Sequence, residues 1–550
     1  MIARCSAGWR PYALLTLLCL ALYLPGIAAL PPLDRDESRF AQATRQMLES
    51  GDYLRIRFQD EARNKKPVGI YWLQAASVAA LGDAQSNAIW PYRLPSLVGA
   101  TAAVLLSFAL GSAVVGREAA LTGAALLACS LGVVVEAHLA KTDAMLLATV
   151  AAAQGALGII YLRARRGGAP APWPWALLFW TAQGAGLLIK GPVTPLVGLL
   201  TAAALSLADR DARWLKALRP LWGVPLMLAL AAPWFIAITA ATGGAFLGEA
   251  VGHDLVGKLT GAQEAHGAPP GYYLLLSAAT FWPGSLLIGP ALAWAWQQRA
   301  TAAERFLIAW AVPFWVVLEI VPTKLPHYIL PVYPALALLA GRAVLALGDG
   351  AVIRRRWLDG ITIALWAAVA VALAAALALL PGRFGAGFDV VGLVAAAILL
   401  NVAGWLAVAA WRGGPALAAT IAALALVAFA PAFHRVAPEL DQLWLSREAA
   451  AMVARYHPPP DAPVAAVGYR EPSLVFLLGT GTRFLAPDSA AEYVTATRGA
   501  AALVSDRDDA AFRSALQARG WEPRAVERVD GLDYSNGQRM TLTLYTRAPS

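Results

Sequence analysis

Long apolar segments recur along the chain up to residue 432, and short polar turns separate them. A helix that crosses a membrane needs about 20 consecutive apolar residues. Windows of that size predict a polytopic α-helical membrane protein with about thirteen transmembrane helices. The predicted spans lie near residues 12–30, 91–115, 119–135, 142–162, 173–189, 191–208, 219–241, 272–298, 304–322, 328–347, 357–380, 388–411 and 414–432.

Two polar stretches interrupt this pattern. The first, residues 31–90, carries eight Lys/Arg and eight Asp/Glu between the first two spans. The second, residues 433–550, alternates between helical and strand patterns, and its Asn536-Gly537 pair predicts a turn between two late strands. We therefore expect a transmembrane domain over 1–432, in which 31–90 is the first outer loop with juxtamembrane helices. A small α/β or α+β domain is expected over 433–550, where the elements are helices near 446–456, after 487 and near 508–519, with strands at 464–467 and 500–504.

Composition supports the membrane assignment. Hydrophobic residues make up 59% of the 550 residues and charged residues only 14%, whereas soluble chains average about 25% charged residues. The net charge is +9, but residues 433–550 hold 13 Lys/Arg and 14 Asp/Glu, so the basic excess belongs to the membrane part. This distribution favours anionic ligands and a defined membrane topology, and it does not indicate a nucleic-acid partner. The three cysteines provide neither a disulfide framework nor a metal-binding cluster.

The charges of the short loops predict the orientation. With the N-terminus inside, the inner loops hold sixteen Lys/Arg and the short outer loops only five. An odd number of spans then places residues 433–550 outside. The first span is expected to be a retained signal anchor, although a cleavable signal peptide is the alternative.

Two clusters in the first outer loop could carry chemistry. Asp36, Arg39 and Phe40 share one helical face just after the first span. Acidic residues at a helix start also suit the helix dipole, which is the structural alternative. Lys65 and Lys66 precede Pro67, which favours an extended backbone at Lys66. They could clamp a phosphate or simply touch anionic headgroups.

Three further outer segments carry polar candidates. Asp143 begins a span after a short loop and could be a helix cap or a second functional acid. The loop 242–271 contains His253, His266 and Lys258, but two histidines 13 residues apart are weak ligands for a metal, so no metal or other cofactor is firmly expected. Lys324, His327 and Tyr328 lie between prolines at an outer helix end.

Together, these segments suit a substrate with an anionic phosphate, a sugar and a lipid tail. The cations would neutralise the phosphate, a carboxylate would act on the acceptor, and the spans would hold the lipid. A transporter would more often show ionisable groups near the membrane midplane and repeated halves. A flippase for a lipid-linked sugar is therefore the rival interpretation.

The motifs DRDESRFAQATRQMLESGDY, NKKPVGIYWLQA and TKLPHYILPVYPALALLAG resemble those of GT-C fold glycosyltransferases that use polyprenyl-phosphate sugars. These enzymes form the protein O-mannosyltransferase superfamily. Among them, the chain looks most like bacterial aminoarabinose transferases, which modify lipid A. The resemblance covers the whole layout of spans, first outer loop and C-terminal domain.

The resemblance also implies roles for individual residues. Asp36 matches the catalytic aspartate of the first loop, with Glu37 and Arg39 in its usual Asp-Glu-x-Arg setting, and Asp143 resembles the second acidic position. The residues implied in binding the donor phosphate or substrate are Arg39, Lys66, His253, Lys258, Lys324 and Tyr328, with Glu37, Lys65 and His327 as further candidates. One departure is that the aminoarabinose enzymes commonly have Glu-Lys-Pro where this chain has Lys65-Lys66-Pro67.

The resemblance implies a glycosyltransferase of the bacterial inner membrane. It would move a sugar from undecaprenyl or another polyprenyl phosphate to lipid A or another envelope glycan. A protein O-glycosyltransferase of the same fold is the alternative acceptor class. The N-terminus would be cytoplasmic and the C-terminal domain periplasmic.

Overall fold

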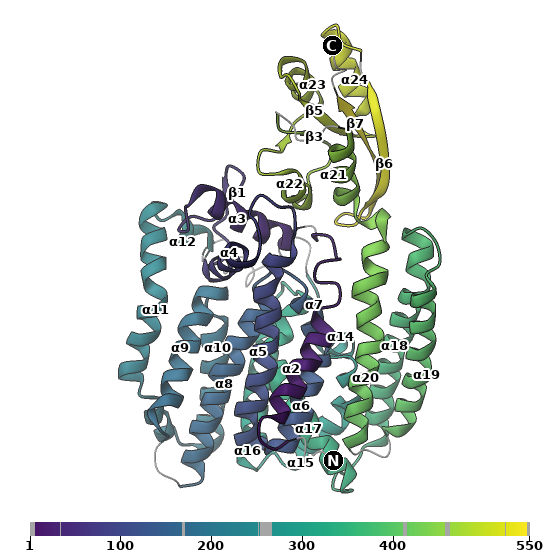
Figure 1. Ribbon diagram of the computed structural model, residues 1–550. Coiled ribbons are helices and arrows are strands. Elements are labelled where there is room, and N and C mark those ends of the chain that lie inside the picture. Colours follow the sequence, from purple (N-terminus) through teal and green to yellow (C-terminus); the bar gives the residue numbers. More distant parts are fainter. Residues whose placement is uncertain are drawn as a thin grey trace.

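The computed structural model describes residues 6–33, 35–167, 171–250, 252, 267–410, 415–456, 462–522 and 524–546. Figure 1 shows a bundle of long helices that carries a small sheet-containing domain on one end. Helix α2 (Arg10–Tyr23) begins at the opposite end of the bundle. The elements of the first outer loop lie between the bundle and the small domain.

Every one of the thirteen predicted spans overlaps a helix, although the span predicted at 12–30 is helical only as far as Tyr23. Besides α2, the bundle helices are α5 (Trp90–Val115), α6 (Arg117–Cys129), α7 (Leu131–Ala137), α8 (Asp143–Arg165), α9 (Trp173–Lys190), α10 (Val193–Asp209), α11 (Pro220–Ala241), α14 (Tyr272–Thr280), α15 (Ile288–Gln297), α16 (Ala302–Ile320), α17 (Tyr333–Gly348), α18 (Arg356–Phe384), α19 (Val390–Ala409) and α20 (Pro415–Pro431). A short helix, α12 (Ala245–Leu247), follows α11.

Fewer than thirteen of these helices have the length and composition of a membrane span. Among the described residues, seven helices are long and apolar enough to cross a membrane, or nine if two bent pairs each count as one span. The bends are 61° between α6 and α7 and 120° between α14 and residues 284–297. They divide two of the predicted spans, near 119–135 and 272–298, and a run of apolar residues could not reveal them. Helices α2 and α10 are apolar but short, with 14 and 17 residues.

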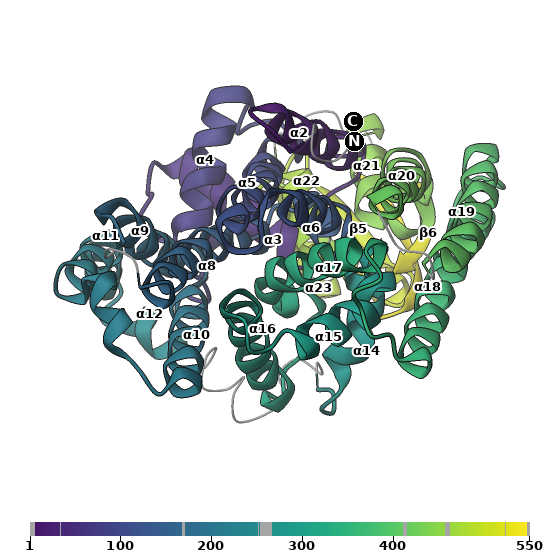
Figure 2. The ribbon, with the colours of Figure 1, turned by 90° about the horizontal axis from the view of Figure 1, so that it is seen from below.

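The bundle is packed most tightly around α8. Nearly all of this helix is buried, because α5, α9, α10 and α16 surround it. In the view from below, α9 and α11 form one edge of the bundle and α18 and α19 the other (Figure 2). The two edges expose many apolar side chains, such as Leu221, Trp222 and Val371, as expected for surfaces that face lipid.

The C-terminal domain has an α/β architecture, as predicted. Its sheet has the order β4-β3-β5-β7-β6, parallel across its first three strands and antiparallel at β5–β7 and β6–β7. The strands are β3 (Ala465–Val467), β4 (Arg483–Phe484), β5 (Ala501–Ser505), β6 (Ala525–Asp533) and β7 (Gln538–Thr546). Helices α21 (Leu445–Tyr456) and α22 (Pro472–Leu478) pack on one face of the sheet, and α23 (Pro487–Ala496) and α24 (Asp509–Ala518) on the other.

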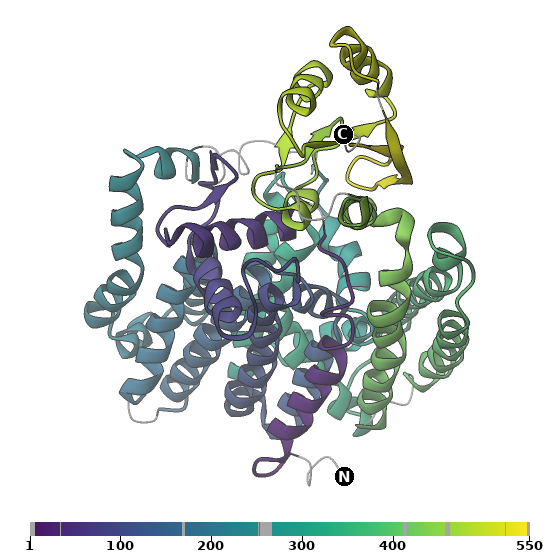
Figure 3. The ribbon, with the colours of Figure 1, turned by 45° about the horizontal axis from the view of Figure 1, so that its top comes forward.

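The sequence did not indicate α22 or β4. Helix α22 is nevertheless one of the parts of the domain that pack directly against the first outer loop. Figure 3 shows the domain rising from the bundle above this loop. The boundary at residue 433 remains a prediction.

The first outer loop folds into α3 (Asp36–Ser50), the two-residue strands β1 (Arg57–Phe58) and β2 (Glu61–Ala62), and α4 (Gly69–Leu81). Helix α3 begins with two carboxylates, which suit the helix dipole, and ends at Gly51 in the left-handed conformation. Its apolar side, including Phe40, packs with Tyr71 of α4 and with α11. The loop is therefore a built structure, and it places Asp36 at a helix start.

A fully buried ion pair ties this loop to the bundle. The carboxylate of Glu37 receives two hydrogen bonds of 2.8 and 2.9 Å from Arg93 of α5. Arg93 also donates to the carbonyls of Ile27, Leu30 and Pro31, so all five of its N–H donors are used. Glu37, which the sequence suggested as a further site residue, thus has a structural role in the described contacts.

We expect Glu37→Gln to destabilise the protein strongly. The change removes the charge that compensates Arg93, and breaking a buried pair from one side costs about 3–5 kcal/mol. The melting temperature of the purified protein in detergent should fall by several degrees. Glu49→Gln on the same helix is the matched control, because the Glu49–Arg45 pair is partly exposed and worth about 1 kcal/mol or less. Equal melting temperatures for the two variants would contradict the assignment.

Candidate active site

Asp36 lies at the first turn of α3 with 54% of its side chain exposed, and the protein atoms packed around the exposed carboxylate still limit its hydration. Its nearest described cation is Arg63, at 3.8 Å. Arg63 is held in place because its guanidinium stacks over the Phe40 ring at 5.0 Å and donates to the Tyr71 hydroxyl at 3.3 Å. Two segments of the first loop therefore meet around Asp36.

A second group of charges lies where α7, α8 and α9 end or begin. Lys141 donates to Glu136 at 3.0 Å, and Lys190, at the end of α9, donates to Asp143 at the start of α8. His327 lies between the two carboxylates, at 3.9 Å from each. All five side chains are largely shielded from solvent. Opposite charges alternate through this cluster, so each buried charge has a partner.

The segment after α16 completes this cluster. The short 3-10 helix Pro326–Val332 carries His327 and Tyr328 toward it. The Tyr328 ring lies edge-on to His327 at 5.0 Å, and the ammonium of Lys190 lies 5.1 Å from the centre of that ring. The aromatic face thus contacts the cation that also binds Asp143.

The two groups act on each other electrostatically. Burial on its own would raise the pKa of Asp36, but nearby basic side chains outweigh burial and hold the pKa below the usual carboxyl value. The basic groups that face it are Lys141, Arg63, His327 and Arg39. Asp36 is therefore an anion at neutral pH. Its lowered pKa also makes it a weaker base than an ordinary carboxylate.

The structure brings together four of the side chains that the sequence singled out. The segments of Asp36, Asp143, His327 and Tyr328 converge at one end of the bundle. Arg39 and Lys66 are half-buried on the first loop and Lys65 is exposed. Their roles in phosphate binding stay predictions. His253 and Lys258 lie outside the described residues.

Lys324 shows a different environment from the one expected of a phosphate ligand. Its ammonium donates to the carbonyls of Leu318, Glu319 and Val321 at 3.2, 2.9 and 2.6 Å. These contacts cover the C-terminal end of α16, where a cation is favourable. The described geometry gives Lys324 a capping role, and its predicted contact with substrate remains a prediction.

Sequence reasoning missed Lys190 as a site residue. In the sequence, Lys190 served only as one of the few basic residues of the predicted outer loops. A single lysine at the end of an otherwise apolar helix could nevertheless have indicated a functional or paired charge. Sequence reasoning also missed Arg93, a single arginine near the start of a long apolar span. A charge in such a position is costly unless it is paired, so both were candidates for buried contacts.

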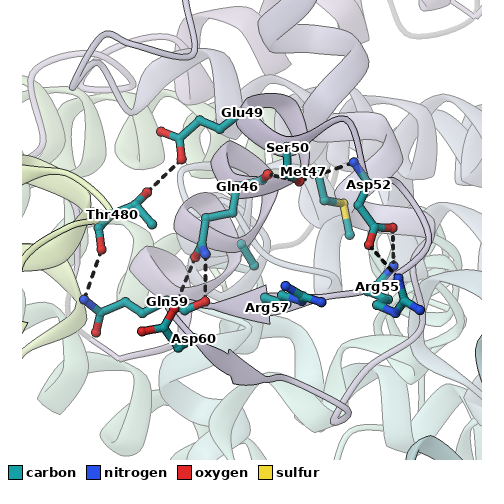
Figure 4. A pocket seen from close by; sticks show the side chains of 11 residues that line it. Gln46, Met47, Glu49, Ser50, Asp52, Arg55, Arg57, Gln59, Asp60 and Thr480 are labelled. Atoms are coloured by element: carbon teal, nitrogen blue, oxygen red, sulfur yellow. Dashed lines mark hydrogen bonds and ion pairs between the residues drawn. The ribbon is translucent and has the colours of Figure 1, made fainter. Parts of the chain in front are cut away.

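A separate surface hollow of about 330 Å³ lies along the later part of α3 (Figure 4). Gln46, Arg57 and Asp60 line it, and Thr480 of the C-terminal domain closes one side by bonding to Glu49 and Gln59. Asp36 is not among its lining residues. Within the part of the chain that the structure describes, no group of three His, Cys, Asp or Glu side chains could hold a metal ion.

These features define a polytopic membrane protein of the GT-C fold, with a charged site under a C-terminal domain. Solved structures share this fold. ArnT from Cupriavidus metallidurans bound to undecaprenyl phosphate superposes with a TM-score of 0.73 over 98% of both chains at 21% identity. The archaeal oligosaccharyltransferase AglB from Archaeoglobus fulgidus, in complex with an inhibitory peptide and a dolichol-phosphate, gives 0.53 over 90% of this chain and 69% of its own, at 12% identity.

The sequence comparisons match a mannosyltransferase family and a set of aminoarabinose arabinosyl transferases. The dolichyl-phosphate-mannose-protein mannosyltransferase family matches residues 31–243. Undecaprenyl phosphate-alpha-4-amino-4-deoxy-L-arabinose arabinosyl transferase of Pseudomonas aeruginosa (strain LESB58) is 30% identical over 61% of this chain. Its namesake from Aeromonas salmonicida (strain A449) is 29% identical over 71% of this chain and 70% of its own. The match spans 60% of the length of the Pseudomonas relative. The resemblance seen in the motifs is confirmed.

We expect Lys190→Met to destabilise the protein because it leaves Asp143 buried with fewer cations around it. The double variant Lys190→Met/Asp143→Asn removes both charges, so it should be more stable than Lys190→Met alone. Melting temperatures of the wild type, both single variants and the double variant form a complete cycle. Strictly additive effects would show that the two side chains do not interact.

Proposed function

We propose that this protein is a glycosyltransferase that moves a sugar from a polyprenyl phosphate to an acceptor at the outer face of the membrane. The observation that carries the proposal is the convergence of Asp36 with Arg63, Lys141 and the Asp143–Lys190 pair at one end of the GT-C bundle. Cations and carboxylates at one membrane face suit a phosphate leaving group beside a sugar. Among the described residues, no comparable cluster of charged side chains lies in the middle of a span, where a flippase would be expected to have one.

The names of the relatives suggest which donor this chain uses. Their names specify undecaprenyl phosphate-alpha-4-amino-4-deoxy-L-arabinose as the donor, and a solved structure of the same fold holds undecaprenyl phosphate. We infer the same kind of lipid donor for this chain. Lipid A or another envelope glycolipid is the acceptor that we favour. Lys65 stands where the aminoarabinose enzymes commonly have a glutamate, so this position offers no carboxylate to bind a 4-amino group. The identity of the transferred sugar should therefore be tested first.

In the reaction, the bond between the anomeric carbon and the donor phosphate oxygen breaks, and an acceptor oxygen bonds to that carbon. Polyprenyl phosphate leaves and gains negative charge. Lys66 and Arg39 are proposed to stabilise that charge. Positive charge develops on the sugar ring, and the ionised carboxylate of Asp36 is placed to stabilise it.

The acceptor decides whether a base is needed. A hydroxyl acceptor would require Asp36 to take its proton, whereas a phosphate acceptor is already an anion. The lowered pKa of Asp36 makes it better suited to stabilise positive charge than to remove a proton. His253 and Lys258 are proposed as further phosphate contacts.

Asp36→Asn should slow the reaction by about 100-fold or more while donor affinity changes little, because the amide keeps the size but loses the charge. Single-turnover release of polyprenyl phosphate from a short-chain donor measures this rate. With a hydroxyl acceptor, which does not titrate in this range, the wild-type rate should stay flat as the pH falls from 8 to 5, since the lowered pKa keeps Asp36 ionised. A rate that falls steeply over this range would contradict the assignment.

Lys66→Ala is the contrasting variant within this experiment. It should weaken donor binding and also slow turnover, because the phosphate is charged in the ground state and gains charge in the transition state. Lys66→Arg should restore activity only in part, since a flat guanidinium does not fill the place of an ammonium. If Asp36→Asn turned over normally, suspicion would move to Asp143. If no variant and no wild type released polyprenyl phosphate, the proposed function would be wrong.

We also propose that the C-terminal domain faces the periplasm and the N-terminus the cytoplasm. In a chain without its native cysteines, Asp488→Cys in the C-terminal domain should react with a membrane-impermeant thiol reagent added to spheroplasts. Arg213→Cys, in the short 3-10 helix Arg213–Leu218, should react only after permeabilisation. Both original side chains are largely exposed, so labelling depends only on whether the reagent can reach that side of the membrane. The reverse pattern would invert the topology.

A further inference from the structure

The backbone just before Asp36 is strained. Arg35 has φ 64° and ψ −106°, a combination that glycine adopts easily and that residues with a Cβ atom rarely adopt. The left-handed Arg210 and Arg219 have ψ values of 30° and 55°, so Arg35 is unlike them. Strain of this kind persists only when surrounding contacts hold it. The next residue is the first residue of α3, so the conformation of Arg35 aims Asp36.

A contact from the C-terminal domain holds Arg35. Its guanidinium donates to the carbonyl oxygen of Ser535 at 2.7 Å. Ser535 lies in the turn between β6 and β7, and Asp533 fixes that turn by accepting from the Ser535 amide and hydroxyl at 3.1 and 2.7 Å. The acceptor is therefore part of a rigid hairpin tip.

Glu471 adds charge to the same contact. The hydroxyl oxygen of Ser535 lies within hydrogen-bond distance of the Glu471 carboxylate as well as that of Asp533, so the two carboxylates share one hydroxyl proton. Glu471 also attracts both Arg35 and Arg39. Burial is the main reason that the pKa of Glu471 is raised, and Asp533 adds to it. Arg39 also acts on Asp36. The charge of Glu471 is thus linked through Arg39 to the site.

Attachment of the domain does not explain this contact. The domain already docks through α22, where Arg45 donates to the Phe476 carbonyl at 2.9 Å and Asn87 to the Leu477 carbonyl at 2.6 Å. The rings of Tyr92 and Phe476 also pack edge to face. The Arg35–Ser535 bond is exposed, so it adds little to docking.

We propose that Glu471 and the Ser535 turn are positioning groups of the active site. They hold Arg35 in its strained conformation and thereby fix the carboxylate of Asp36 at the start of α3. Neither group touches the reacting atoms. The C-terminal domain is then a working part of the site, and this inference rests on the proposed function of Asp36.

Three changes at position 35 of the full chain test the proposal. Arg35→Ala loses the contact but still has a Cβ atom that disfavours this backbone conformation, so Asp36 should lose its alignment. Single-turnover release of polyprenyl phosphate should then fall by roughly tenfold or more while donor affinity stays within about twofold. Arg35→Lys can still donate to Ser535 and should recover most of the rate. Arg35→Gly accepts the backbone conformation without strain, so it should be faster than Arg35→Ala. Glu471→Gln should lower the rate with donor affinity unchanged.

Arg519→Ala is the matched control, because its ion pair with Asp488 joins α24 to α23 on the side of the domain away from the bundle. It should have the wild-type rate. Wild-type rates in Arg35→Ala and Glu471→Gln, with Asp36→Asn still slow, would overturn the positioning role and leave the proposed function intact. A rate loss in Arg35→Ala that merely parallels lost folding or donor binding would also overturn it. A normal rate in Asp36→Asn would overturn the role of Asp36 on which this inference rests, whereas the proposed function itself would be overturned only if the wild type released no polyprenyl phosphate.

Discussion

The buried pair of Arg93 and Glu37 is the interaction on which the rest of the site depends. An unpaired charge in that position would be very costly, so the pair forces the start of α3 against α5. The same carboxylate accepts the amide of Ala140 at 2.8 Å and the amide of Leu33 at 2.9 Å. One buried side chain thus fixes the first outer loop, the chain that leaves α2 and the loop before α8.

This constraint decides which charges Asp36 meets. Because Glu37 binds the amide of Ala140, the neighbouring residues Asp36 and Lys141 are brought together. Lys141 in turn pairs with Glu136, and Asp143 pairs with Lys190. The alternation of signs lets several ionised groups remain in a poorly hydrated place. The site is therefore prepared for a charged substrate before any substrate binds.

Much of the fold followed from the sequence because helices that face lipid must be long and apolar. Asp36, Asp143 and Tyr328 could be selected for the same reason, since polar residues at the outer ends of such helices are conspicuous. The bends at α6–α7 and at α14 could not be predicted, because apolar residues on either side of a break look like one continuous run.

The docking of α22 and the role of Arg93 could not be predicted from the sequence for other reasons. Helix α22 has only seven residues, so its periodicity is weak. Arg93 pairs with a residue 56 positions away, and no local pattern encodes such a distance. Lys190 likewise meets Asp143 across 47 positions. Sequence showed which side chains could do chemistry, but the choice between a ligand and a structural contact, as at Glu37 and Lys324, required the packing.

Asp36 is held from two sides by interactions of different strength. On the bundle side, Glu37 is locked by a buried pair that is too costly to open, so this side acts as a fixed base. On the solvent side, Arg35 is held by an exposed hydrogen bond to the carbonyl of Ser535 in the C-terminal domain. Such a bond opens more easily than a buried ion pair. The orientation of the Asp36 carboxylate can therefore change when the hydrogen bond of Arg35 opens or closes, while the buried pair of Glu37 keeps the bundle folded. Of these two supports, the contact with the C-terminal domain is therefore the one that can change without breaking a buried ion pair.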